Sequence, residues 1–206
     1  MPETIFIVDD DADVRESLKA LLESAGYSVR DFASARAVLA DEHLAGASCL
    51  IADIRMPDMD GLSLQEELVN RQSGLPVIVV TGHGDVPLAV RAMKVGATDF
   101  IEKPFDDEAL LGSVRRAMDI AKQSRDQASL VQTAETRIAT LTARERQVLE
   151  HLVAGQPNKI IAYELSISPR TVEIHRAHLM EKMQARSLSD LVRQALAVGI
   201  VPAVRS

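Results

Sequence analysis

Short apolar runs alternate with amphipathic segments from Thr4 to Lys122, and this alternation limits the folds open to the chain more than any other feature. The segments between the runs predict helices near residues 12–25, 34–42, 62–71 and 86–95, and another from about Asp106. Repeated strand-helix units with nearly unbroken apolar strands are typical of a doubly wound, five-stranded parallel sheet covered on both faces. The five runs that predict strands are IFIV, SVRDF, CLIAD, LPVIVVT and DFIE.

Polar residues stand at the ends of four of these runs. Asp9 and Asp10 follow the first run, and Asp53 ends the third. Thr81 ends the fourth run, and Lys103 follows the fifth. Because the C-terminal ends of parallel strands lie along one edge of an open sheet, we expect these side chains to converge in one crevice. Asp53 then becomes a candidate phosphate acceptor.

The carboxylates at these strand ends suggest a metal ion. Clustered carboxylates repel one another, so a cation is needed to neutralise them. Mg²⁺ prefers hard oxygen ligands and keeps several waters, so two carboxylates and a backbone carbonyl suffice, and such an ion can hold phosphoryl oxygens while an Asp attacks. Taken alone, the run Asp9, Asp10 and Asp11 is explained more simply by a solvated loop that caps a helix.

The charge of the chain is divided between its two ends. The net charge is −7, but residues 1–122 carry 12 basic and 22 acidic side chains, a charge of −10, whereas residues 141–206 carry 9 and 6, a charge of +3. An acidic module followed by a mildly basic one indicates that only the second meets an anion such as DNA.

The single cysteine and the lengths of the apolar runs restrict the remaining classes. Cys49 has no second thiol, which excludes a disulfide or zinc framework within the chain, and it is expected in the core. No apolar run approaches the roughly 18 residues of a membrane span, and residues 1–8 lack the order of a signal peptide. We therefore expect a cytoplasmic protein without a membrane partner.

Three regions follow from these patterns: a domain over residues 1–122, a helical linker over 123–140, and an all-α domain of four short helices over 141–206. The linker has an incomplete apolar stripe, which predicts a semi-rigid spacer, with weak pairing to a second copy as the alternative. In the last region, Thr142 and Glu145 have the spacing of a capping box, and Ser168 with Pro169 has the order of a cap and first helical residue.

The last long helix has one core side and one outward side. At 100° per residue, Val172, Leu179 and Met183 share the core side. If the helix lies in a DNA major groove, its outward side presents Glu173, Ile174 and Ala177 to base edges. Arg176 lies at the margin, where it reaches a base or a phosphate. Four other side chains are better suited to phosphate contacts: Lys159, Arg170, Thr171 and Lys182.

Four segments together resemble the receiver domain of two-component response regulators, a CheY-like, flavodoxin-like fold: Val8-Asp9-Asp10, DIRMPDMDG at residues 53–61, TGHGD at 81–85 and FIEKPF at 100–105. The resemblance implies that Asp53 accepts phosphate from a histidine kinase. It also implies that Asp10, Asp53 and the Arg55 carbonyl hold Mg²⁺, with Asp9 acting partly through water. Lys103 would contact the phosphate, and Thr81 and Phe100 would form a switch pair.

The final region resembles the LuxR-type helix-turn-helix, through residues 141–149, 158–162 and 167–183. With the receiver, this places the chain among NarL/FixJ-class regulators, most similar to FixJ-type transcriptional regulators. The resemblance implies dimerisation through the phosphorylated receiver and binding to promoter DNA, with transcriptional activation and RNA polymerase as a further candidate partner. It does not imply an enzyme.

Two alternatives stay open at this point. The terminal helices could bind protein instead of DNA, because a charge of +3 is modest. The first domain could be a phosphotransferase with an Asp nucleophile. Such hydrolases commonly need a second carboxylate two residues after the nucleophile, and Arg55 stands there instead.

Overall fold

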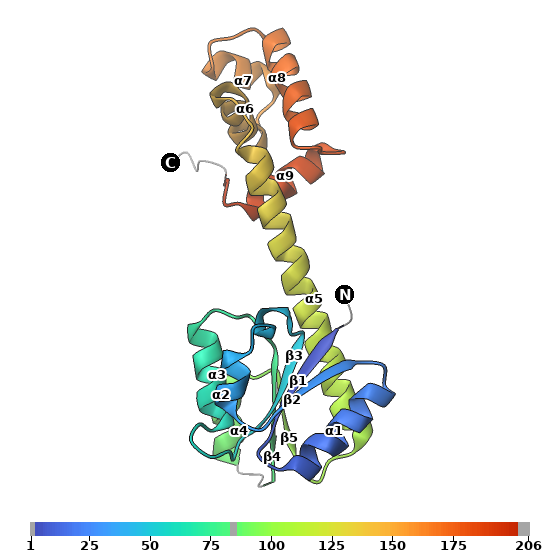
Figure 1. Cartoon of the computed structure of the whole chain (residues 1–206). Coiled ribbons are helices and arrows are strands. Elements are labelled where there is room, and N and C mark those ends of the chain that lie inside the picture. Colours follow the sequence, from blue (N-terminus) through green and yellow to red (C-terminus); the bar gives the residue numbers. More distant parts are fainter. Residues whose placement is uncertain (1–2, 83–85, 202–206) are drawn as a thin grey trace. The chain divides into compact units, whose positions relative to one another are not determined.

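The computed structural model describes residues 3–82 and 86–201 and contains one five-stranded sheet (Figure 1). All four strand pairings are parallel, in the order β2-β1-β3-β4-β5, which confirms the predicted doubly wound sheet. Residues 83–85 of the TGHGD segment, including His83, lie outside the described residues. The strands are β1 (Thr4–Val8), β2 (Ser28–Phe32), β3 (Cys49–Asp53), β4 (Val77–Thr81) and β5 (Asp99–Glu102).

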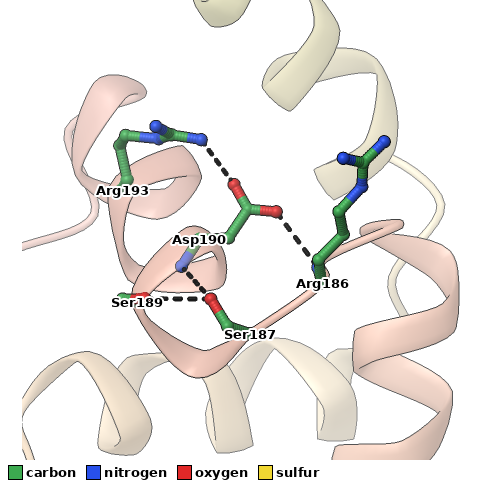
Figure 2. Close-up of a pocket in the computed structure, with 5 residues that line it drawn as sticks. All are labelled: Arg186, Ser187, Ser189, Asp190 and Arg193. Atoms are coloured by element: carbon green, nitrogen blue, oxygen red, sulfur yellow. Dashed lines mark hydrogen bonds and ion pairs between the residues drawn. The ribbon is translucent and has the colours of Figure 1, made fainter.

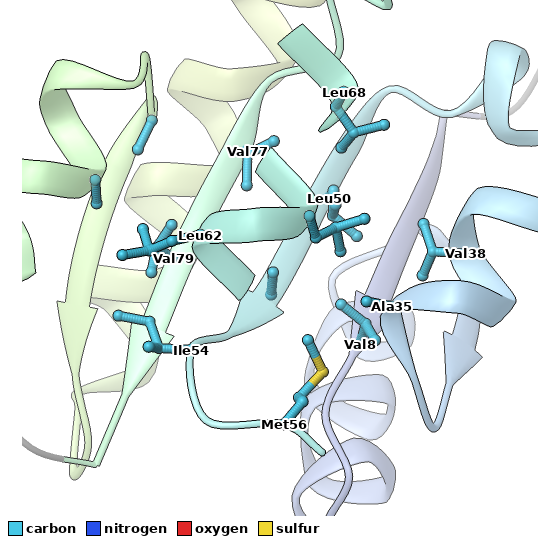
Figure 3. Close-up of a cluster of buried hydrophobic side chains, with 14 of the residues drawn as sticks. Val8, Ala35, Val38, Leu50, Ile54, Met56, Leu62, Leu68, Val77 and Val79 are labelled. Atoms are coloured by element: carbon cyan, nitrogen blue, oxygen red, sulfur yellow. The ribbon is translucent and has the colours of Figure 1, made fainter. Parts of the chain in front are cut away.

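Helices cover both faces of this sheet. A cluster that includes Leu50 and Val79 packs against α2 (Ala35–Ala40), α3 (Gly61–Asn70) and α4 (Val86–Lys94), as Figure 3 shows. A second cluster packs the other face against α1 (Ala12–Ser24) and the start of α5 (Asp107–Ile138). A short 3₁₀ turn, η1 (Leu44–Gly46), precedes β3.

Alternate residues of the strands supply these two clusters, because successive side chains point to opposite faces. Leu50 of β3 belongs to the first cluster, whereas Cys49 and Ile51 belong to the second. Cys49 is fully buried, as predicted, and burial raises the pKa of its thiol far above the ordinary value. The cysteine is therefore a core residue.

Helix α5 is longer than the patterns suggested. The sequence predicted a helix from about Asp106 and a helical linker over residues 123–140, and the structure joins the two in a single helix of 32 residues. No helix-ending signal separates the two predicted segments, so the helical hydrogen bonds continue through residues 122–129, which are exposed. The chain divides within α5 into two compact units, Met1–Ser124 and Arg125–Ser206.

The second unit has the four predicted helices: α6 (Ala143–Val153), α7 (Asn158–Glu164), α8 (Pro169–Lys182) and α9 (Leu188–Ala197). The capping box of Thr142 and Glu145 is present, and Ser168 caps α8. Residues from all four helices form one buried cluster, to which the end of α5 adds Ile138. Over residues 3–82 and 86–201, no helix is long and apolar enough to cross a membrane.

Candidate phosphoacceptor site and DNA-binding surface

The sheet brings three distant residues together at the C-terminal ends of its strands. The Lys103 Nζ lies 2.7 Å from Asp9 Oδ2 and 2.8 Å from Asp53 Oδ1. Asp9 follows β1, Asp53 ends β3, and Lys103 follows β5, which the strand order places on one edge. The side chains of Asp9 and Asp53 are 4% and 9% exposed, so two carboxylates share one ammonium in a site largely shielded from water.

The pKa values of Asp53 and Lys103 are both shifted at this site. Burial raises the pKa of Asp53, and Asp9 adds to the rise, while Lys103 and the Arg55 N–H oppose it. The backbone N–H of Arg55 donates to Asp53 Oδ2 at 2.7 Å. Burial disfavours the Lys103 ammonium, but its hydrogen bonds to Asp53 and Asp9 hold its pKa above the ordinary value. A protonated lysine therefore faces Asp53 at neutral pH.

The three adjacent aspartates have different roles. Asp9 is buried, and its Oδ1 accepts a hydrogen bond from the Asp11 N–H at 2.9 Å. Asp11 caps α1 and accepts from Asp13 and Val14, so the simpler explanation holds for this residue. Asp10 is exposed. The run thus joins one residue of the site, one helix cap and one exposed carboxylate.

Arg15 holds the backbone of this acidic loop, a role that the sequence did not reveal. Its Nη1 donates to the carbonyl oxygen of Asp9 at 2.8 Å and to that of Asp10 at 3.2 Å. Its Nε lies 3.6 Å from Asp31 Oδ2. The one sequence signal for this role was the position of Arg15, one turn into the helix that follows the aspartates. Because its acceptors are backbone carbonyls, which every residue has, no residue type in the sequence marks them.

Gly61 was also missed as a structural requirement. A Cβ on Gly61 would lie 2.2 Å from the carbonyl oxygen of Asp53 and 3.2 Å from the Ile54 Cα. The Gly61 N–H donates to the Ile54 carbonyl at 3.0 Å. The start of α3 can therefore approach the end of β3 this closely only without a side chain.

The donor set suits Mg²⁺ in chemistry. Asp9, Asp10, Asp53 and the Arg55 carbonyl offer hard oxygens, which this ion prefers. Among the described residues, however, no three His, Cys, Asp or Glu side chains gather as a metal-binding group. Asp10 is exposed, and the Lys103 ammonium bonds both buried carboxylates. The chain's own cation serves as their counter-ion.

Thr81 and Phe100 lie on neighbouring strands and share one face of the sheet. Val79 pairs with Phe100 in the parallel ladder, so their side chains point to the same face of the sheet. Thr81 lies two residues after Val79 and therefore points to that face as well. Thr81 is buried, and Phe100 is half-buried against the first core cluster. The Thr81 carbonyl accepts the Lys103 N–H at 2.7 Å, and the Lys103–Pro104 peptide is cis. Thr81 is thus tied by its backbone to Lys103.

In the second unit, α8 has the predicted division between buried and exposed residues. Val172, Leu179 and Met183 are fully buried. Glu173, Ile174 and Ala177 are exposed, and the Ile174 side chain is 47% exposed although it is large and apolar. The outward side of α8 is therefore exposed among the described residues of this unit, as the prediction of base contacts requires.

The predicted phosphate contacts fall into two groups. Lys159 is exposed, and the Arg170 side chain is 84% exposed, with Glu173 Oε2 at 3.7 Å from its Nη1. In contrast, Arg176 donates to Asn158 Oδ1 at 2.6 Å and so joins α8 to α7. Thr171 is half-buried and bonds the Ser168 cap.

Lys182 also has partners inside the unit. Its Nζ lies 2.7 Å from Glu145 Oε2 and 3.3 Å from the Thr140 carbonyl. Burial opposes the charge of Glu145, but the hydrogen bonds from Lys182 and Thr142 lower its pKa to about 2. Lys182 thus completes the capping box of α6, and its contact with DNA stays a prediction.

A shallow pocket at the start of α9 gathers two arginines and two serines around Asp190 (Figure 2). Asp190 accepts from the Arg186 N–H at 3.1 Å and from Arg193 Nη2 at 2.7 Å. The hydrogen bond from the Arg186 N–H has the largest effect, and with the bond from Arg193 it lowers the pKa of Asp190. The Asp190 carboxylate thus pairs with the Arg193 guanidinium and caps the backbone at Arg186.

Comparison with known proteins defines the class to which the two units belong. Residues 5–115 match the response regulator receiver domain, and residues 139–195 match the bacterial regulatory proteins of the luxR family. The chain therefore belongs to the response regulators with a LuxR-type DNA-binding domain, which are transcriptional regulators.

Within this class the chain is similar to FixJ-type regulators. It is 51% identical to the transcriptional regulatory protein FixJ of Azorhizobium caulinodans over 205 residues, 98% of this chain and 97% of that protein. Full-length FixJ from B. japonicum is a similar solved structure, with 48% identity, a TM-score of 0.57 and coverage of 97% and 98% of the two chains. A low-resolution structure of the response regulator StyR has 40% identity, a TM-score of 0.80 and coverage of 95% and 99%. The chain is a FixJ-type response regulator.

Proposed function

We propose that Asp53 is the residue that accepts a phosphoryl group from a partner histidine kinase. The observation that carries this proposal is the Lys103 ammonium, which bonds both Asp9 and Asp53 at the edge of the sheet. In the transfer, an Asp53 oxygen attacks phosphorus, the new O–P bond forms, the P–N bond to the kinase histidine breaks, and the imidazole keeps the electron pair. Lys103 is placed to donate to the phosphoryl oxygens and to offset their charge.

Mg²⁺ is the cofactor that we propose for this site. Asp10, Asp53 and the Arg55 carbonyl would hold it, with Asp9 beside them. When bound, the ion supplies positive charge that screens the carboxylates from the phosphoryl oxygens. Arg15 holds the backbone of Asp9 and Asp10 in place for this task.

Phosphorylation would act on Thr81 and Phe100. A phosphoryl group adds about −1.5 to −2 charges and three strong acceptors, so a Thr81 hydroxyl on the same face is drawn toward it. Phe100 can fill the space that Thr81 leaves, which changes the surface around α4, β5 and α5. We propose that the altered surface pairs two copies of the chain.

The second unit would then bind promoter DNA through α8, with Glu173, Ile174, Arg176 and Ala177 at base edges and Lys159, Arg170, Thr171 and Lys182 at phosphates. A dimer doubles the phosphate contacts, which compensates for the modest charge of each copy. The absence of a second carboxylate at Arg55 weighs against turnover as an enzyme, and we propose activation of transcription, with RNA polymerase as a partner.

The test uses Asp53→Asn with Asp58→Asn as the matched control, because Asp58 is an exposed carboxylate on the same loop. Acetyl phosphate labelling with Mg²⁺ should be lost in the first variant and kept in the second, and chelation by EDTA should suppress it in wild type. Size-exclusion chromatography and DNA retardation should show larger species and tighter binding only when label is present. Equal labelling of Asp53→Asn and wild type would refute the assignment.

A further inference from the structure

The last turn of α5 carries an arginine that is hydrogen-bonded to both of the last two helices and to the turn between them. Arg137 Nη1 donates to the Met183 carbonyl at 3.0 Å and to Gln194 Oε1 at 3.1 Å. Its Nη2 donates to Gln184 Oε1 at 2.7 Å. One half-buried guanidinium thus joins α5, the end of α8 and α9.

The Met183 carbonyl belongs to the C-terminal end of α8, where helical carbonyls have no partner within the helix. Met183 is the residue that caps α8, and its side chain is fully buried in the core of the unit. Gln184 follows with a φ of 49°, the left-handed conformation that ends a helix. A cation at this position also opposes the negative end of the helix dipole. Arg137 therefore bonds the carbonyl at which α8 ends.

The Gln194 contact extends this connection to the start of α9. Gln194 is 3% exposed, so its amide oxygen depends on protein donors such as Arg137. The other end of the same amide contributes to the lowered pKa of Asp190. Asp190 in turn accepts from Arg186 and Arg193 in the pocket of Figure 2. The network therefore runs from α5 to both ends of the α8–α9 turn.

The end of α5 is thus part of the DNA-binding unit. Ala134 is fully buried and Ile138 is 6% exposed within it. The match to the luxR family begins at residue 139, after Arg137. The end of α5 lies outside the family match, yet its Arg137 donates hydrogen bonds to the end of α8, the helix that presents Ile174.

We propose that Arg137 is a positioning residue for DNA recognition, which sets the direction of α8 through its C-terminal end. The inference rests on the proposed use of α8 to read DNA. A residue that only added stability would leave DNA affinity unchanged in folded protein, whereas a positioning residue changes affinity in protein that is fully folded.

The experiment compares full-length Arg137→Met and Arg137→Lys with Arg144→Met. Arg144 is an exposed arginine of α6 whose side chain bonds Gln147, so its variant removes the same charge without touching α8. The probe is a labelled duplex selected by wild-type protein from random sequences, and binding is measured by anisotropy at a temperature where circular dichroism shows every variant folded. Hydrogen exchange of the amides of residues 183–185 is measured without DNA.

Arg137→Met should weaken binding about tenfold relative to Arg144→Met, a change of about 1.4 kcal/mol, and speed exchange at residues 183–185. The DNA affinity and the exchange rates of Arg137→Lys should lie between those of Arg137→Met and Arg144→Met. If Arg137→Met does not fold, Arg137→Lys alone is compared with Arg144→Met. Affinity within twofold of Arg144→Met, or unchanged exchange at these amides, would overturn the inference. Ile174→Ala separates the proposed reading of DNA by α8 from the proposed positioning of α8 by Arg137. If this variant keeps the sequence discrimination of wild type, α8 does not read DNA. The hydrogen exchange of residues 183–185 then decides alone whether Arg137 holds the end of α8.

Discussion

A methyl group on Gly61 should damage the phosphoacceptor site more than its size suggests. The added Cβ would lie 2.2 Å from the Asp53 carbonyl oxygen, which is about 1 Å or more short of an ordinary contact. The three nearest atoms all belong to the backbone of Asp53 and Ile54, so no flexible side chain can give way. We expect Gly61→Ala to cost about 3 kcal/mol, the upper end of the usual cost of overpacking.

Gly112→Ala is the matched control. Gly112 lies inside α5, and the nearest atom to its added Cβ is the flexible end of Arg116, at 3.7 Å. The same substitution should therefore stabilise the first unit by about 0.5–1 kcal/mol, because alanine favours a helix and restricts the unfolded chain. Two identical chemical changes are thus expected to act in opposite directions.

Urea unfolding can be followed by tyrosine fluorescence, because the chain has no tryptophan and two tyrosines. In a Tyr163→Phe background, Tyr27 reports on the first unit alone. Acetyl phosphate labelling should fall at least about tenfold in Gly61→Ala, since a displacement of 1 Å can cost much more than that in a positioned reaction. Equal stability and equal labelling in the two glycine variants would refute this reasoning.

Three further predictions concern charge. Asp53→Asn should raise the free energy of unfolding at pH 7. Because the pKa of Asp53 is raised in the folded state, the wild-type protein loses stability as pH rises above 3.8. Urea titrations from pH 4 to 7 should therefore show that the difference in unfolding free energy between the variant and wild type grows with pH. Lys103→Met should cost about 2–3 kcal/mol at pH 7 by leaving Asp9 beside Asp53 without their cation, with a smaller deficit at pH 4 in the same titration. Glu145→Gln should cost the second unit about 1–2 kcal/mol at pH 7; the wild-type advantage, present above pH 4.5, should fade as pH falls toward about 2, as acid unfolding by circular dichroism can check.

Much of the first unit could be predicted from the sequence because its signals are local or periodic. Strand runs, helix caps and the shared edge of parallel strands follow from residue patterns, so the convergence of Asp9, Asp53 and Lys103 followed from topology alone. The sides of α8 were equally predictable, since a 3.6-residue repeat fixes which residues face the core.

What could not be predicted depends on backbone atoms and on tertiary partners. Arg15 and Arg137 act on carbonyl groups, which every residue has, so no pattern of side chains marks their targets. Gly61 is set by an approach of two backbones that no spacing encodes. The continuity of α5 was hidden because the exposed residues 122–129 have no periodic apolar side, yet their helical hydrogen bonds need none.

The number of basic residues in the second unit overstates how many side chains are available to DNA, because several of them are hydrogen-bonded within the fold. Lys182 bonds Glu145 and Arg176 bonds Asn158, whereas Lys159 is exposed. Lys159→Ala should therefore reduce the slope of log affinity against log salt by about 1, with equal loss on all sequences. Lys182→Ala should reduce the slope by less than Lys159→Ala, because the Lys182 ammonium is shared with Glu145, and it should also lower the urea midpoint of the second unit. Anisotropy titrations at four salt concentrations separate the two lysines, and a slope reduced equally by Lys182→Ala would show that this residue meets phosphate despite its bond to Glu145.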